Sequence, residues 1–96
     1  MSDTVKRLRD SIVRQELEPP ATLLVHRAES NLAKWGEQDY ETLALAVAEE
    51  AGELAQAVLH YRHENGAQIR INAEAIDLGA LCLQVIRHFD HEMGLT

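Results

Sequence analysis

The sequence is poor in cysteine, proline and aromatic residues, and each shortage excludes a class of protein. Cys82 is the only cysteine among the 96 residues, so no disulfide can form within the chain and we expect a reducing cytoplasm. The two prolines and five glycines leave long uninterrupted stretches, none of which alternates apolar and polar residues as strands do. Because aromatic residues make up only 4%, the core must be built from aliphatic side chains. The sequence therefore predicts an all-α fold.

Positive charge and long apolar runs are also scarce. Sixteen acidic residues face nine lysines and arginines, and the net charge of −7 argues against binding a nucleic-acid polymer. The longest apolar runs are far too short to cross a bilayer, and no apolar segment follows the basic residues near Lys6. We therefore expect a cytoplasmic protein without a signal peptide and without a membrane partner.

Apolar residues recur at steps of three and four along most of the chain, as they do in amphipathic helices. This spacing predicts helices at 4–18, 21–35, 40–64 and 68–92. Gly36 and the pair Asn65-Gly66 are suitable residues to end the second and third helices, and Asp39 or Thr42 can cap the third. At this length the helices form one domain, residues 1–96, folded as an antiparallel bundle in which 1–20 is a peripheral helix.

Two features of the last two helices bear on packing. The third helix carries an apolar stripe that should be buried: Leu43, Val47, Leu54, Val58 and Tyr61. Gly52 and Gly79 lie inside helices, where glycine costs about 1 kcal/mol relative to alanine, so we expect a close neighbour at each. The last helix has apolar residues on more than one side, which predicts that a second subunit covers it in a homo-oligomer, either a dimer or a tetramer.

Five acidic residues on these two helices form the most informative pattern in the chain. Glu50 and Glu53 are three residues apart, and so are Glu74 and Asp77, which places each pair on one helix face. Glu49, Glu50 and Glu53 all lie within an arc of about 100° around the helix. An antiparallel return of the chain would bring the two pairs face to face. Carboxylates so close together repel unless some are protonated or a cation lies among them.

Oxygen ligands with room for water suit Mg²⁺, with Mn²⁺ as an alternative. We therefore predict Glu50, Glu53, Glu74 and Asp77 as metal ligands, and Glu49 as a further ligand or as the base that activates a water. The competing interpretation is a solvated glutamate-rich helix face, which is the commoner meaning of either segment alone. The two segments together, on successive helices, favour the metal site.

The arrangement Glu49-Glu50-x-x-Glu53, a spacer of twenty residues, and Glu74-x-x-Asp77 resembles the signature of the MazG-like all-α nucleoside triphosphate pyrophosphohydrolases. The resemblance extends over roughly residues 22–90. It implies a helical bundle that binds Mg²⁺ and cleaves a nucleotide between its α- and β-phosphates, with Glu49, Glu50 and Glu53 in catalytic positions.

His26 and Trp35, nine residues apart, resemble a spacing in the dCTP pyrophosphatase-like branch of that superfamily, where such residues line the pocket and the indole stacks on the base. Stacking on an aromatic ring stabilises any base by about 1 to 3 kcal/mol. The alternative is a core tryptophan and a surface histidine. The candidate phosphate-binding cations are Lys34, Arg27, Arg62 and Arg70, and Lys34 is the one that we would test first. The chain lacks a second tryptophan after the first acidic motif, so the base preference stays open.

Three hypotheses follow. The first is a Mg²⁺-dependent hydrolase that converts an NTP or dNTP to the monophosphate and pyrophosphate, for pool sanitation or dNTP control. The second is the related phosphoribosyl-ATP pyrophosphohydrolase, which has a similar acidic pattern. The third is a helical oligomerisation or metal-binding module without catalysis. His26 and Trp35 favour the first hypothesis.

Overall fold

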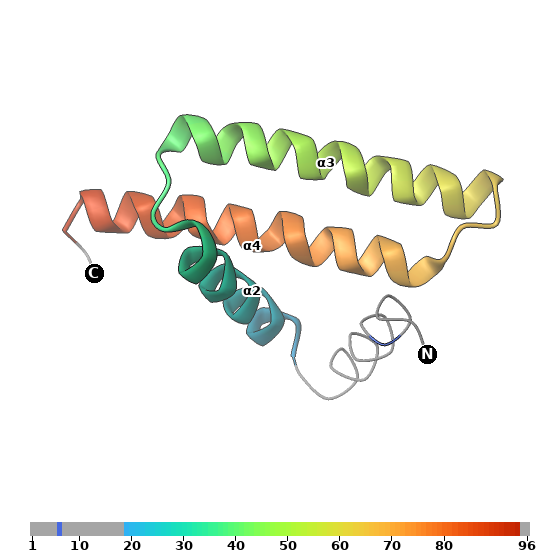
Figure 1. Cartoon of the computed structure of the whole chain (residues 1–96), viewed down its shortest axis with the longest axis horizontal. Helices are drawn as coiled ribbons and strands as arrows, with labels where there is room; N and C mark the ends of the chain where they lie inside the picture. The colour runs from blue at the N-terminus through green and yellow to red at the C-terminus, as the bar shows by residue number, and fades with distance from the viewer. Residues whose placement is uncertain (1–5, 7–18, 95–96) are drawn as a thin grey trace.

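The structure, a computed structural model, describes Lys6 and residues 19–94. Residues 19–94 contain three helices. They are α2 (Pro20–Trp35), α3 (Tyr40–His63) and α4 (Gln68–Glu92), shown in Figure 1. No strand occurs within these residues. The all-α prediction is confirmed, and the three predicted helix ranges agree with the observed ones to within one residue. The first predicted helix, 4–18, lies outside the described residues except for Lys6.

The ends of the helices have local causes that the sequence anticipated. α2 ends where Gly36 takes a positive φ of 73°, and the Gly36 amide donates to the Leu32 carbonyl at 2.8 Å. α3 begins at Asp39, whose side chain accepts a hydrogen bond from the Thr42 amide at 2.9 Å. Its other end is followed by Asn65, also at positive φ, before the chain turns into α4. The end of α2 and both ends of α3 are thus set by short-range chemistry.

The central element of the bundle is α4, because α2 and α3 each pack on α4 rather than on each other (Figure 1). α2 and α3 thus cover two sides of α4, while its apolar residues Ile86 and Phe89 stay 56% and 51% exposed. Gly79 lies at the closest approach of α2, since a Cβ there would come within 2.7 Å of Leu24 Cδ2. The close neighbour predicted for Gly79 is confirmed. Among the described residues the buried apolar ones are few: Leu23, Ala28, Leu43, Ala57, Ala80 and Leu81.

Two packing predictions for α3 were wrong. Nothing lies within 4 Å of a Cβ built on Gly52, so no neighbour among the described residues requires a glycine there. The apolar stripe is buried at Leu43, whereas Val58 and Tyr61 at its far end are 37% and 43% exposed. The physical reason is that α3 packs along one helix only, so the α4 side of α3 is covered and the flanks are open.

Candidate active site

A cleft of about 380 Å³ lies between α2, α3 and α4. All three helices contribute to it, together with the loop between α2 and α3. Its lining residues are Arg27, Asn31 and Trp35 of α2, Gln38 of the loop, Ala46, Glu49 and Glu50 of α3, and Asp77 and Leu81 of α4. The small side chain of Ala46 leaves room in the wall beside Glu50. The volume falls in the range of about 300 to 1,000 Å³ that is usual for small-molecule sites.

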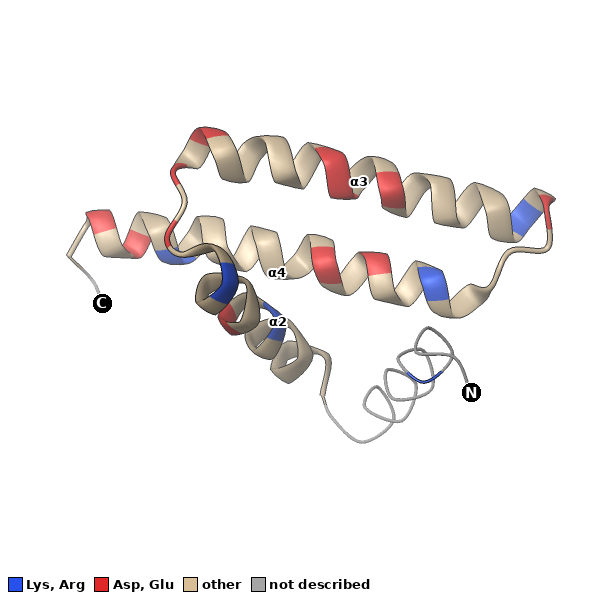
Figure 2. Cartoon of the chain, in the orientation of Figure 1, with Lys and Arg blue, Asp and Glu red and all other residues tan. Residues whose placement is uncertain are grey.

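The acids of α3 and α4 meet beside this cleft, as Figure 2 shows for the acidic segments halfway along the two helices. Glu50, Glu74 and Asp77 each place a carboxylate oxygen within 4.8 Å of the others, and all three side chains are partly buried. α3 supplies one of these acids and α4 supplies two, so the antiparallel pairing of the helices creates the group. Three of the four residues predicted as metal ligands are therefore brought together.

Glu50 is the acid most affected by its surroundings. Its pKa is raised from 4.5 to about 7, first by burial, then by hydrogen bonding to the Glu74 carboxyl and by the charges of Asp77, Glu74 and Glu53. Its Oε2 atom is buried and accepts no hydrogen bond from any described residue. A buried carboxylate oxygen without a donor is costly, so Glu50 requires either a proton or a cation.

Asp77 experiences two opposing influences. Burial raises its pKa and the Glu74 charge raises it further, while the Arg27 guanidinium acts in the opposite direction. Arg27 Nη1 lies 2.9 Å from Asp77 Oδ1, an ion pair between α2 and α4. The arginine is the nearest counter-charge to this side of the acidic group.

The donor set fits a hard divalent cation. Mg²⁺ holds oxygen ligands at about 2.0 to 2.1 Å, so opposite ligand oxygens lie about 4.2 Å apart. A span of up to 4.8 Å among Glu50, Glu74 and Asp77 therefore needs only small side-chain rotations. The three groups are all carboxylates, which select Mg²⁺ or Mn²⁺ over the metals that prefer nitrogen and sulfur.

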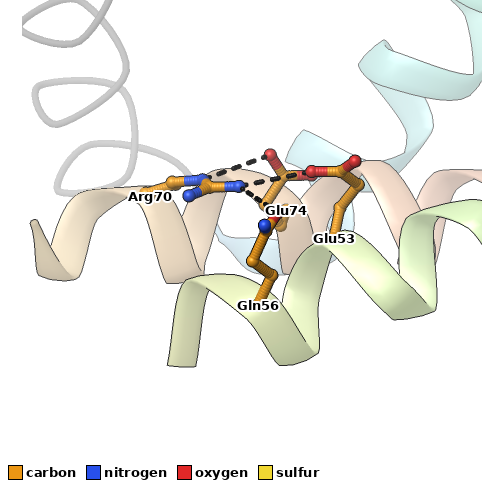
Figure 3. Close-up of polar contacts among 4 residues, drawn as sticks. All are labelled: Glu53, Gln56, Arg70 and Glu74. Atoms are coloured by element: carbon orange, nitrogen blue, oxygen red, sulfur yellow. Dashed lines mark hydrogen bonds and ion pairs between the residues drawn. The ribbon is translucent and has the colours of Figure 1, made fainter. Parts of the chain in front are cut away.

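Glu53 is held apart from this group by Arg70. Arg70 Nη2 donates to Glu53 Oε2 and to Gln56 Oε1, both at 3.2 Å, while its Nε lies 4.0 Å from Glu74 Oε1 (Figure 3). Glu53 is nevertheless close enough to contribute to the raised pKa of Glu50. The structure thus places Glu53 at the flank of the acidic group, where its role as a metal ligand remains a prediction. Glu49 is exposed at the wall of the cleft.

The predicted substrate-binding residues of α2 separate into two sets. Trp35 lines the cleft and is 61% exposed, so the core alternative for this tryptophan is wrong. His26 is exposed and does not line the cleft. Nine residues correspond to about 900° of helix rotation, which puts His26 and Trp35 on opposite sides of α2. Lys34 is also absent from the lining, and its Nζ lies 4.9 Å from the centre of the Trp35 ring.

Two residues of α2 line the cleft beside Trp35 in place of His26 and Lys34, which the sequence favoured. Arg27, Asn31 and Trp35 follow one another at steps of four, so they share a helix face, and all three line the cleft. Arg27 was only one of several cation candidates, and Asn31 carried no prediction. Asn31 donates to Gln84 Oε1 at 2.9 Å, which ties this face of α2 to α4. The four-residue spacing back from Trp35 was the signal that could have identified both.

The chain was compared with models of protein families, with curated proteins and with solved structures, and none of them matches. The resemblance to the MazG-like superfamily therefore depends on the sequence pattern alone and stays a prediction. In the described residues no helix is long and apolar enough to cross a membrane.

Proposed function

We propose that the chain is a Mg²⁺-dependent nucleoside triphosphate pyrophosphohydrolase of the MazG-like type. One observation carries the proposal: Glu50 and Asp77, two of the three clustered carboxylates, line the same cleft as an exposed tryptophan and an arginine. A nucleotide needs these three kinds of group, because the triphosphate requires cations and the base stacks on an aromatic ring. An ordinary solvated helix face would have no reason to place them around one cavity.

Each residue has a distinct part in this proposal. Glu50, Glu74 and Asp77 would hold the metal, and Glu53 would join them if Arg70 releases it. When bound, the ion lowers the pKa of a coordinated water and offsets phosphate charge. Glu49, at the wall of the cleft, would accept the proton of the attacking water. Trp35 offers an indole face to the base. One water is consumed at the α–β phosphoanhydride, and the products are the nucleoside monophosphate and pyrophosphate.

Partner and compartment are further parts of the proposal. Large apolar side chains remain exposed on all three helices, including Leu45 at 73%, Leu59 at 58% and Ile86 at 56%. Surfaces of this kind are usually covered in an assembly, which supports a homo-oligomer. Cys82 is an exposed free thiol, in keeping with a reducing cytoplasm.

The ion pairs of Arg27 and Arg70 favour one other function. If these arginines neutralise the carboxylates permanently, the cluster needs no metal, and the chain is a helical oligomerisation module without catalysis. Clustered acids paired with arginines are common in proteins that hold no ion. The two functions differ in a simple way, because only the enzyme releases pyrophosphate.

The test is a panel of NTPs, dNTPs and phosphoribosyl-ATP incubated with Mg²⁺, in which pyrophosphate and orthophosphate are measured separately. We expect pyrophosphate from at least one NTP or dNTP, and its loss by at least a thousandfold in Asp77→Asn. Glu29→Gln, at an exposed position of α2 outside the cleft, is the matched control and should retain full activity. Release from phosphoribosyl-ATP alone would point to the histidine-biosynthesis enzyme. No pyrophosphate from any nucleotide would favour the module.

A further inference from the structure

Arg27 occupies an unusual position between the acidic group and the cleft. It belongs to α2, it lines the cleft, and its Nη1 lies 2.9 Å from Asp77 Oδ1 on α4. Its side chain is half exposed, whereas that of Asp77 is 30% exposed. The guanidinium is therefore anchored at one end by a carboxylate but retains donors that face the solvent of the cleft.

A single Asp77 carboxylate, with one negative charge, cannot fully neutralise two cations. If Asp77 coordinates a divalent ion, its charge is shared with that ion, and the nearby guanidinium is repelled by the ion's positive charge. Arg27 then loses its partner while it remains at the wall of the cleft. The nearest new partner of suitable chemistry is a phosphate oxygen, which the planar guanidinium can bind through two parallel hydrogen bonds.

We propose that Arg27 is a phosphate-binding residue of the cleft. Asp77 holds the Arg27 guanidinium in place until a divalent cation binds the Asp77 carboxylate. This inference rests on the proposed function and adds a residue that positions the substrate. It also makes metal and nucleotide binding cooperative, because the cation frees the residue that holds the phosphates.

The register of α2 agrees with this role. Arg27 and Trp35 are eight residues apart on one face, a rise of about 12 Å along the helix. A nucleoside triphosphate extends over a similar length from its base to its outer phosphates. A base stacked on Trp35 would thus direct its phosphates along α2 towards Arg27 and the acids.

The other nearby cations are less suitable. Arg70 does not line the cleft, and it already contacts acceptors on three side chains: Glu53, Gln56 and Glu74 (Figure 3). Such a guanidinium is fixed in a structural role beside the carboxylates. Lys34 directs its ammonium to the Trp35 ring, and it is likewise outside the lining.

Calorimetry on three variants of the full chain tests the inference without depending on turnover. Mg²⁺ alone is titrated first into wild type, Arg27→Gln, Arg70→Gln and the control Arg62→Gln, an exposed residue in the last turn of α3. The second ligand, in saturating Mg²⁺, is the α,β-methylene analogue of the best substrate, or of ATP if no nucleotide is hydrolysed. Circular dichroism verifies that each variant is folded.

The affinities of Arg27→Gln for Mg²⁺ and for the analogue should change in opposite directions. Arg27→Gln should bind Mg²⁺ about fivefold more tightly, equal to about 1 kcal/mol, because a competing cation is gone. The same variant should bind the analogue at least tenfold more weakly, because a charged hydrogen-bond donor is lost. Arg70→Gln should also tighten Mg²⁺ binding but change analogue binding by less than threefold. Arg62→Gln should change neither.

Three results would overturn it: unchanged binding of both ligands to Arg27→Gln, weaker binding of both, or tighter Mg²⁺ binding with analogue binding unchanged. None of these depends on pyrophosphate release by the wild type. Failure of the proposed enzyme and failure of the Arg27 assignment can therefore be told apart.

Discussion

Replacing Glu50 by glutamine should stabilise the protein in alkaline, metal-free buffer, which is the opposite of what most substitutions at a partly buried position do. Burial and three neighbouring acids raise the pKa of Glu50 from 4.5 in the unfolded chain to about 7 in the folded state. The difference of about 2.5 corresponds to about 3 kcal/mol. Because Glu50 is only partly buried, solvent screening reduces this contribution to about 2 kcal/mol.

The direction in which stability changes with pH follows from proton binding. Between pH 4.5 and 7 the folded protein keeps the Glu50 proton while the unfolded chain loses it, so stability falls as pH rises. The favourable contribution of Glu50 is complete below about pH 4.5 and is lost as pH passes through about 7. Glutamine has no proton to lose and keeps the neutral state at every pH. The advantage of Glu50→Gln should therefore be near zero at pH 4.5 and about 2 kcal/mol at pH 8.

Urea unfolding followed by circular dichroism, in EDTA at pH 4.5 and pH 8, measures this difference. For a chain of this size, about 2 kcal/mol corresponds to a rise in Tm of roughly 10 °C at pH 8. Glu29→Gln, at an exposed site on α2, is the control and should lie within about 0.5 kcal/mol of wild type at both pH values. The same experiment with Mg²⁺ should stabilise wild type at pH 8 and have much less effect on Glu50→Gln.

Two outcomes would refute this reasoning. If Glu50→Gln is no more stable than wild type at pH 8, then Glu50 is ionised without penalty and the acids do not crowd one another. If Mg²⁺ stabilises wild type and Glu50→Gln equally, the ion binds elsewhere. In either case the cation site that we assign to the acidic group would be wrong.

Four further substitutions test the fold and the assembly. Gly79→Ala should bring the protein less stability in urea unfolding than the gain of about 1 kcal/mol that alanine gives in a helix, because the new methyl group lies 2.7 Å from Leu24 Cδ2 and must displace that side chain. Gly52→Ala should instead stabilise it by about 1 kcal/mol, since nothing described lies within 4 Å; a loss of stability would reveal a neighbouring subunit at this glycine. Asp39→Ala should lower the Tm at pH 7 but not at pH 2, because hydrogen bonds from Thr42 lower the pKa of this N-cap and the benefit disappears as the carboxyl is protonated. Leu45→Glu should reduce the mass seen by sedimentation to that of a monomer if the exposed apolar face of α3 joins subunits; an unchanged mass would place the interface elsewhere.

Local chemistry determined much of this protein from its sequence. The ends of the helices depend on residues a few positions apart, such as the Asp39 cap and the glycine at 36, so the predicted ranges agree closely with the structure. The steps of three between Glu50 and Glu53 and between Glu74 and Asp77 are likewise properties of a single helix. Antiparallel pairing was then sufficient to bring most of these acids together.

Only the tertiary structure decided which side chains share the cleft and which acids are already paired. Helix spacing alone puts Arg27 and Trp35 on one face of α2 and His26 on the opposite face, but only the packing of α2 on α4 decides which of these faces borders the cleft. Arg70 draws Glu53 aside, an ion pair between residues on different helices that no spacing within one helix could predict. The reason is physical: a helix fixes the relative angles of its own residues, but its rotation and tilt against its neighbours depend on the packing of the whole bundle.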